Sequence, residues 1–130
     1  MIVVDASVTI EVLLRTPDAD RLLARLFDAD QPIHAPHLLD LEVAQVLRRY
    51  TVRGALRPTR GLAALRLLRA FPLTRHAHAP LLPRIWALRG HLTAYAAAYV
   101  ALAELLDAPL VTRDRRLGAA PGHRARIEVM

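Results

Sequence analysis

The sequence predicts an α/β fold in which helices cover both faces of a central parallel sheet. Short apolar runs alternate with helical patterns along the whole chain, and no repeat, low-complexity segment or long loop interrupts them. Such alternation is typical of parallel sheets, because each crossover helix returns the chain to the edge where the previous strand began. With 130 residues, the chain is expected to form one domain over residues 1–130.

The first half of the chain contains two strand patterns and three helix patterns. Strands are predicted at residues 2–4 and 33–36, and helices at residues 6–14, 17–30 and 37–54. Asp18 is expected to be the N-cap of the second helix, because its carboxylate can accept the free amide hydrogens of a first turn. The third helix has apolar residues at helical spacing and is expected to end at Gly54.

The second half continues the same alternation. Helices are predicted at residues 58–71, at residues 80–90 and from Thr93 onward, and strands within residues 71–76, 109–112 and 125–130. Pro58 suits a first helical turn, because the amide hydrogen that proline lacks would have no partner there. Thr93 is expected to be an N-cap. The third helical position after it, where a capping box carries an acidic or amide residue, holds Ala96.

Composition excludes several classes of protein. The chain has no cysteine, which excludes disulfides and thiolate metal sites. No segment approaches the roughly 18 uncharged apolar residues of a membrane span. The acid at position 5 also argues against a secretory signal. A cytoplasmic location without membrane contact is therefore expected.

The chain is basic, with a net charge of +6, and all 18 of its basic residues are arginines. A GC-rich genome explains such a composition by itself. Contact with phosphate is the functional alternative, because the planar guanidinium donates two hydrogen bonds to a phosphate group. Net charge alone indicates only weak affinity for polyanions.

Two acids follow predicted strands: Asp5 comes after residues 2–4, and Asp114 comes after residues 109–112. In open parallel sheets, ligands bind outside the carboxyl ends of the strands, so both carboxylates are expected at one edge. The hydroxyl groups of Ser7 and Thr112 are placed to orient a carboxylate or a bound water. The alternatives are an N-cap for Asp5 and a turn residue for Asp114; the two acids together favour a functional site.

A third acid, Glu42, lies near one edge of the apolar stripe of the helix over residues 37–54. Asp40 flanks the other edge of the same stripe. Periodicity therefore does not distinguish a site role for Glu42 from that of a solvated charge.

Four segments carry a resemblance to a known family: IVVDAS, LLDLEVAQVL, LTAYAAAYVALAELLDAPLVTRDRRL and a short final strand. On these segments, the chain resembles the PIN-domain toxin ribonucleases of the VapBC toxin–antitoxin systems over essentially its whole length. The resemblance implies a three-layer α/β/α sandwich and Mg²⁺- or Mn²⁺-dependent endonucleolytic cleavage of RNA. It also implies a homodimer, and pairing with a small antitoxin whose C-terminal segment fills an acidic groove.

By the same resemblance, a metal-binding cluster of acids falls on Asp5, Glu42, position 96 and Asp114. Asp5 and Asp114 would be the main metal ligands, and Glu42 would be a ligand or would orient the attacking water. Several carboxylates in one pocket repel each other, and a hard divalent cation removes that penalty. Such a metal can polarise a phosphodiester, activate a water and stabilise the leaving oxygen.

The family's usual residue at position 96 is aspartate, whereas this chain has Ala96 between neighbours that match the pattern. We hypothesise a deliberate inactivating change, made because an active toxin harms the cell that expresses it. Natural loss of activity is the alternative, and a mass spectrum of the native gene product with alanine at position 96 would refute the engineered explanation. With one ligand and one negative charge missing, we expect weaker metal binding and little or no cleavage.

Arginines near these acids are candidates to hold an RNA backbone. They are Arg48, Arg49 and Arg53 after Glu42, and Arg113, Arg115 and Arg116 beside Asp114. Taken singly, each arginine is better explained as a solvated surface charge.

Two other functions compete with the ribonuclease. A degenerate PIN domain would hold RNA or a partner without cutting, and Ala96 favours this alternative if it is natural. A receiver-type phosphoacceptor domain also places acids at strand ends, but it uses a lysine near its site, and this chain has none.

The remaining polar and aromatic candidates have weaker support. The pairs His34/His37 and His76/His78 lack the cysteines or HExxH context of a zinc site, so structural or surface roles are expected. Glu104, two turns after position 96, either borders the site or is a surface charge. Core or interface positions are expected for the aromatic residues Trp86, Tyr95 and Tyr99.

Overall fold

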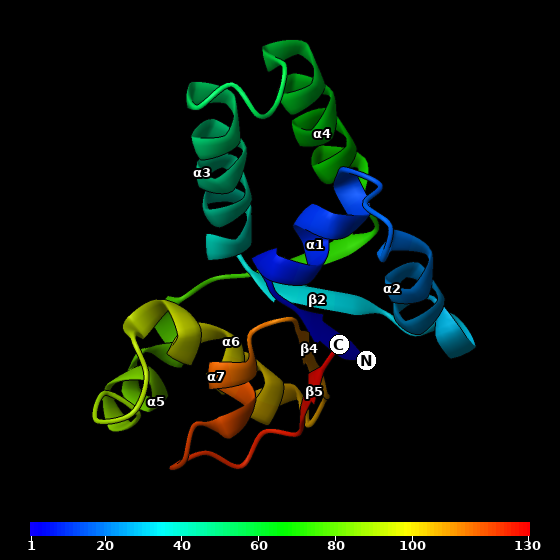
Figure 1. Ribbon diagram of the computed structural model, residues 1–130. Helices are drawn as coiled ribbons and strands as arrows, with labels where there is room; N and C mark the ends of the chain where they lie inside the picture. The colour runs from blue at the N-terminus through cyan, green and yellow to red at the C-terminus, as the bar shows by residue number, and fades with distance from the viewer.

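The computed structural model describes all 130 residues and confirms the α/β prediction (Figure 1). One sheet contains five strands: β1 (Ile2–Val4), β2 (Ile33–Pro36), β3 (Leu73–His76), β4 (Leu110–Thr112) and β5 (Ile127–Val129). Their order is β3-β2-β1-β4-β5, and all four neighbouring pairs are parallel. Strand β1 is therefore central, with β2 on one side and β4 on the other.

Helices lie on both faces of this sheet. They are α1 (Ala6–Leu13), α2 (Ala19–Leu26), α3 (Leu38–Val52), α4 (Pro58–Ala70), α5 (Leu82–Ala87), α6 (Ala94–Leu106) and α7 (Arg115–Ala119). In Figure 1, α1 to α4 lie on one side of the sheet and α5 to α7 on the other, and α3 and α4 project away from the sheet as a hairpin. Right-handed crossovers explain this division. The chain moves from β1 through β2 to β3 toward one edge of the sheet, and then returns to β4 and β5 toward the other edge, so the two sets of connecting helices lie on opposite faces.

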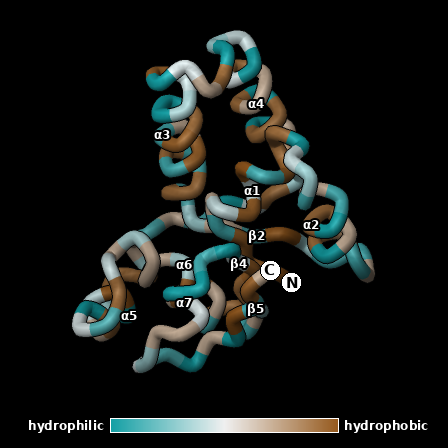
Figure 2. The backbone as a smooth tube through the Cα atoms, in the orientation of Figure 1, coloured by the Kyte–Doolittle hydropathy of each residue, from teal (hydrophilic) through white to brown (hydrophobic).

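The core is formed by the strands and the helix faces that pack on them. The three residues of β1 are fully or almost fully buried, as are Val100 and Leu102 of α6. Figure 2 shows this pattern: α3 and α4 alternate between hydrophobic and hydrophilic residues, and the central strands are mostly hydrophobic. A helix that is polar on one face keeps that face in water.

Three element predictions need correction. The helix predicted over residues 17–30 ends at Leu26 and is followed by a separate 3₁₀ turn, Asp28–Asp30, in which Ala29 has a φ of 56°. Residues 80–90 divide between a 3₁₀ turn, Ala79–Leu81, and α5. The short helix α7 was not predicted, because five residues are too few to show a helical period.

Asp18 precedes α2, but it does not cap the helix with its side chain. Its carboxylate instead accepts a hydrogen bond from the Arg113 guanidinium at 2.9 Å. This ion pair connects the start of α2 to the segment that follows β4, so a tertiary contact has replaced the local cap.

Candidate metal and RNA site

Asp5 directly follows β1, at the switch point of the sheet. The connection after β1 leads to one side of the sheet and the connection after β4 leads to the other side. Open α/β sheets bind ligands in the crevice at this point. Asp5 is also the N-cap of α1, since its Oδ1 accepts the Val8 amide hydrogen at 3.3 Å. The N-cap alternative is therefore correct for Asp5, and it does not exclude a functional role.

Two hydroxyl groups hold the Asp5 carboxylate. Ser7 Oγ donates to Oδ1 at 2.6 Å, and Thr112 Oγ1 donates to Oδ2 at 2.5 Å. Ser7 Oγ in turn accepts the Arg113 amide hydrogen, and Thr112 Oγ1 accepts the Asp114 amide hydrogen. The backbone after β4 thus fixes both hydroxyls, and the hydroxyls fix the carboxylate.

Burial raises the pKa of Asp5, although the hydrogen bonds from Ser7, Thr112 and the α1 backbone lower it in part. No arginine forms an ion pair with Asp5. A buried carboxylate without a positive partner is costly in an apolar interior and favours a cation or a proton.

Glu42, on α3, is the second acid of the site. The buried Tyr99 of α6 donates its hydroxyl hydrogen to Glu42 Oε1 at 2.5 Å. Burial raises the pKa of Glu42, the Tyr99 hydrogen bond lowers it, and the nearby charge of Asp5 raises it again. Asp5 and Glu42 therefore repel each other across the crevice.

Asp40, on the opposite edge of α3, has a different environment. Its two carboxylate oxygens accept hydrogen bonds from Arg75 at 2.8 and 3.0 Å. Arg75 neutralises the charge of Asp40, whereas no arginine neutralises Glu42. The tertiary structure therefore distinguishes two acids that helical periodicity alone could not distinguish.

Asp114 has a structural role close to the turn-residue alternative, although the helix that it caps was not predicted. It is the N-cap of α7, and its Oδ1 accepts the Arg116 amide hydrogen at 2.9 Å. Its side chain is 44% exposed. No group of three or more acidic or histidine side chains is close enough to hold a metal ion. Asp5 and Glu42 come together, whereas the Asp114 carboxylate faces the first turn of α7.

Ala96 lies one turn before Tyr99 on α6, so the two residues share a helix face. The Ala96 amide donates to Thr93 Oγ1 at 3.1 Å, which makes Thr93 the N-cap as expected. The capping box remains incomplete at position 96. An acid there would stand beside the Tyr99–Glu42 contact.

The acids that are present fit a divalent cation of the magnesium type. Mg²⁺ is usually bound by one or two protein carboxylates and keeps waters and substrate phosphate as its other ligands. Asp5 and Glu42 supply two carboxylates at the switch point, and neither is neutralised by an arginine. These two carboxylates are donors of the type that a hard cation binds, and the third carboxylate of a full cluster is missing.

Tyr99 is the site residue that the sequence analysis missed. Because Tyr99 is aromatic, a core or interface position is expected for it, and the residue is indeed buried. Its position three residues after position 96, on one helix face, was the available signal. Trp86 and Tyr95 are not core residues, because they are 68% and 63% exposed.

Neither reading of Glu104 is correct. Its side chain is only 5% exposed and forms a two-pronged ion pair with Arg84, at 2.7 and 3.0 Å. Glu104 Oε1 also accepts the Arg124 amide hydrogen. It is therefore a buried structural acid.

The histidines have structural roles. His34 Nδ1 and His76 Nε2 are 2.8 Å apart, in a hydrogen bond between β2 and β3. His78 Nε2 accepts the Leu38 amide hydrogen at the start of α3. None of them joins a group of three potential metal ligands.

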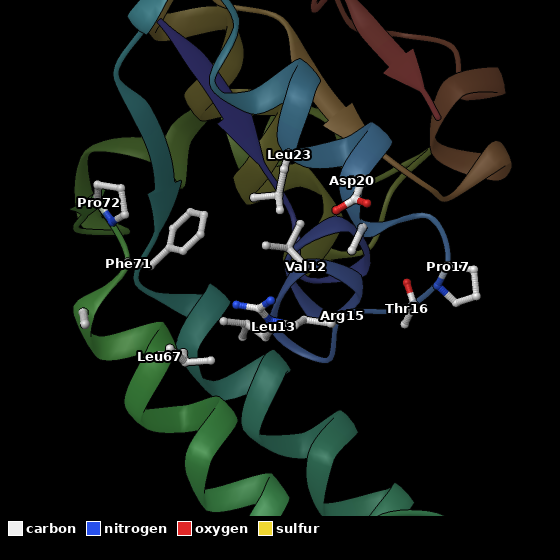
Figure 3. Close-up of a pocket in the computed structure, with 12 residues that line it drawn as sticks. Val12, Leu13, Arg15, Thr16, Pro17, Asp20, Leu23, Leu67, Phe71 and Pro72 are labelled. Carbon is white, nitrogen blue, oxygen red and sulfur yellow. The ribbon is translucent and has the colours of Figure 1, made fainter.

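A large hollow of the protein lies away from the acid pair. Figure 3 shows it between α1, α2 and α4, where Val12, Leu23, Leu67 and Phe71 supply apolar walls. Its volume is about 560 Å³. Because its walls contain neither Asp5 nor Glu42, it is a candidate surface for a partner and not the site of chemistry.

Comparison with known proteins identifies the family of the chain. The PIN domain family matches residues 2–122. The chain is 44% identical to "Ribonuclease VapC9" of Mycobacterium tuberculosis over 117 residues, covering 90% of this chain and 88% of that protein. It is 38% identical to "Ribonuclease VapC12" of the same species over 130 residues, with 100% and 99% covered.

The fold is also that of solved structures. VapBC2 from Rickettsia felis, solved bound to a DNA fragment from its promoter, superposes with a TM-score of 0.73. The match covers 99% of this chain and 98% of that one, at 14% identity, so it supports the fold alone.

No helix of this chain is long and apolar enough to span a membrane. Together with the family match and the two relatives, the fold shows that the chain belongs to the PIN-domain VapC family of ribonuclease toxins.

Proposed function

We propose that this chain is a toxin endoribonuclease that uses Mg²⁺ or Mn²⁺ to cleave RNA, in a form weakened by Ala96. The observation that supports the proposal is the pair formed by Asp5 and Glu42 at the switch point, which has no arginine partner. A bound divalent ion would polarise the phosphodiester and lower the pKa of an attacking water. Asp5 and Glu42 are the residues that would hold it.

The other residues of the site position these two acids. Ser7 and Thr112 fix the rotamer of Asp5, and Tyr99 fixes one oxygen of Glu42, which leaves the other oxygen free for an ion or a water. Asp114, which the resemblance assigned to the metal, caps α7 through Oδ1, so its Oδ2 is the oxygen that remains for an ion. Arg115 and Arg116 are exposed, and Arg116 also lies 3.6 Å from the Asp114 carboxylate, so Arg115 is the freer of the two to contact an RNA backbone.

Cleavage of RNA with Mg²⁺ or Mn²⁺ by a chain carrying Ala96→Asp, with EDTA as the control, tests the proposal. The competing function is a PIN domain that binds RNA or a partner without cutting, and Ala96 is the feature that favours it. If neither the unchanged chain nor Ala96→Asp cuts RNA with either metal, the competing function is the one to retain.

Replacing Glu42 with glutamine should separate its charge from its shape. Because its folded pKa is raised above the unfolded value, the folded state binds more protons between the two values, and stability falls as pH rises through that window. Above the window the charged glutamate is destabilising, so Glu42→Gln should raise the Tm by a few degrees at pH 7. The same variant should lose most of the Tm increase that Mn²⁺ gives the unchanged chain. Thermal melts at pH 7 and below pH 4, with and without Mn²⁺, check both signs. A lower Tm without metal at pH 7 would contradict the repulsion.

Two protein partners belong to the proposal. The apolar hollow of Figure 3 is suited to the apolar face of an antitoxin helix, and VapBC2 supplies the comparison in which such a pair is named. A homodimer is the second partner. It is supported by large apolar side chains left in water at Leu41, Trp86 and Tyr95, which are 73%, 68% and 63% exposed.

Light scattering distinguishes these assemblies. The chain alone should have the mass of a dimer at high concentration. Addition of the cognate antitoxin should give a larger complex, which Leu67→Glu at the wall of the hollow should prevent. A monomer at every concentration would contradict the dimer without affecting the antitoxin proposal.

A further inference from the structure

Charge is unevenly distributed along the chain. Residues 43–103 contain ten arginines and no acidic residue. Seven of the ten lie in the α3–α4 hairpin, and none of these seven forms an ion pair. Acidic partners compensate most arginines elsewhere, so the hairpin that projects from the sheet in Figure 1 is a basic arm.

A hollow lies between α1 and α3, next to this arm. It has a volume of about 290 Å³, and its lining includes Ser7, Arg49 and Tyr50. Ser7 is one of the two hydroxyl donors to Asp5. Arg49 follows Glu42 by seven residues on α3, which is roughly 10 Å at 1.5 Å per residue. The walls of the hollow thus contain a hydroxyl that holds Asp5 and an arginine about two helical turns from Glu42.

Two other arginines of the hairpin, Arg53 and Arg60, lie near this hollow without lining it. The Arg53 guanidinium lies 5.0 Å from the centre of the Tyr50 ring, and Arg60 donates to the Leu14 carbonyl at the end of α1. Arg113 also lines the hollow, and its Nη1 has no hydrogen-bond partner. Glu11 is the one acid in the wall. It accepts the Thr16 hydroxyl hydrogen and faces Arg113 at 4.0 Å, so the charge of Arg49 stays uncompensated.

We propose that this hollow and the α1-facing side of the α3–α4 hairpin form a track for the phosphate backbone of single-stranded RNA leading away from Asp5 and Glu42. Arg49 and Arg53 contact its phosphates. The inference rests on the proposed ribonuclease function for the direction of the strand. Guanidinium groups recognise phosphate through paired hydrogen bonds, and arginine and aromatic side chains together are typical of surfaces that bind unpaired RNA.

Binding without cleavage tests the track. Fluorescence anisotropy of a labelled single-stranded RNA of mixed sequence, in EDTA, is measured for the full chain over a series of salt concentrations. Arg49→Gln combined with Arg53→Gln should weaken binding about tenfold. It should also reduce the slope of log affinity against log salt by about 1.4, for two lost phosphate contacts. Both residues are exposed and have no ion pair, so the melting temperature should change little.

Arg66→Gln combined with Arg69→Gln is the matched control. It removes two positive charges from the same hairpin, as the Arg49/Arg53 variant does, but neither residue lines the hollow between α1 and α3, and Arg69 lines a different hollow with Asp40 and Arg75. Equal loss of binding in the control and in the Arg49/Arg53 variant would overturn the track, because the arm would then act only through net charge. An unchanged salt slope in the Arg49/Arg53 variant would overturn it too. RNA binding in EDTA does not require turnover, so cleavage can fail while the track stands, and the track can fail while cleavage stands.

Discussion

Ala96→Asp should convert a chain that cuts RNA slowly or not at all into a metal-dependent ribonuclease, with a gain in cleavage rate of at least about 100-fold. In the starting structure the charge of Asp5 acts on Glu42, and no group of three acids is close enough to hold a metal ion. A third carboxylate would increase the charge that holds the ion and fix its position relative to the substrate phosphate. Both effects act most strongly in the transition state, where negative charge develops on phosphate oxygens.

The geometry of α6 explains why position 96 is suited to this role. It lies one turn before Tyr99, whose hydroxyl contacts Glu42, and its amide is already fixed by the Thr93 cap. An aspartate there would also stand in the first turn of a helix, where the dipole favours negative charge. The substitution is therefore expected to be tolerated by the fold, and its cost is the repulsion among three acids without metal.

The measurement is the initial rate of RNA cleavage, with Mg²⁺ or Mn²⁺ and with EDTA, for the unchanged chain and for Ala96→Asp produced with its antitoxin and then separated. Ala94→Asp is the matched control, because it adds the same charge to the same helix end on a different face. Only Ala96→Asp should gain metal-dependent activity. Equal gains in both variants would show a general charge effect, and no gain in either would contradict the assignment of position 96.

Local sequence patterns were enough to predict most of the fold. Short segments with apolar residues identified the strands, and Pro58 and Thr93 marked helix starts through local chemistry, the missing amide hydrogen of proline and the side-chain cap of threonine. Failures occurred where a distant contact overrides a local preference. Asp18 has the chemistry of a cap, but Arg113, 95 residues away in sequence, takes its carboxylate.

The site was predictable to the extent that topology controls it. A carboxylate directly after a central parallel strand must reach the carboxyl edge of the sheet, so the place of Asp5 followed from the sequence. The difference between Glu42 and Asp40 did not, because it depends on Arg75 and Tyr99, which come from β3 and α6. The cap at Asp114 was hidden for a similar reason, since α7 is too short for its period to be seen.

Glu104→Ala should be the most destabilising single change among the acids, by about 2–4 kcal/mol at pH 7. Arg84 donates two hydrogen bonds to the Glu104 carboxylate, and the Arg124 amide donates a third. The glutamate side chain is 5% exposed, so truncation leaves these donors unpaired in a poorly hydrated place. The exposed third of Arg84 keeps part of its hydration and limits the loss.

The pH dependence of this loss follows from the same contacts. The Arg84 hydrogen bonds lower the pKa of Glu104, and the Arg124 amide and the two positive charges lower it further against burial. A lowered folded pKa contributes stability above the unfolded value, near pH 4.3, and that stability is lost as pH falls through the folded value. The difference between the unchanged chain and Glu104→Ala should therefore be full at pH 7 and decrease below about pH 4.

Urea unfolding at pH 7 and pH 3 measures this difference, and Asp107→Asn provides the comparison. Asp107 is near Glu104 on the same helix end and also binds an arginine, Arg126, at 2.8 Å, but the two side chains are 90% and 60% exposed. An exposed ion pair contributes little, so Asp107→Asn should change the free energy of unfolding by less than about 1 kcal/mol at either pH. Similar losses for both variants would mean that burial does not control the strength of these ion pairs. A large loss confined to Glu104→Ala would mean that the end of α6 depends on one buried acid, at the far end of the helix from position 96, where a new carboxylate is expected to bind metal.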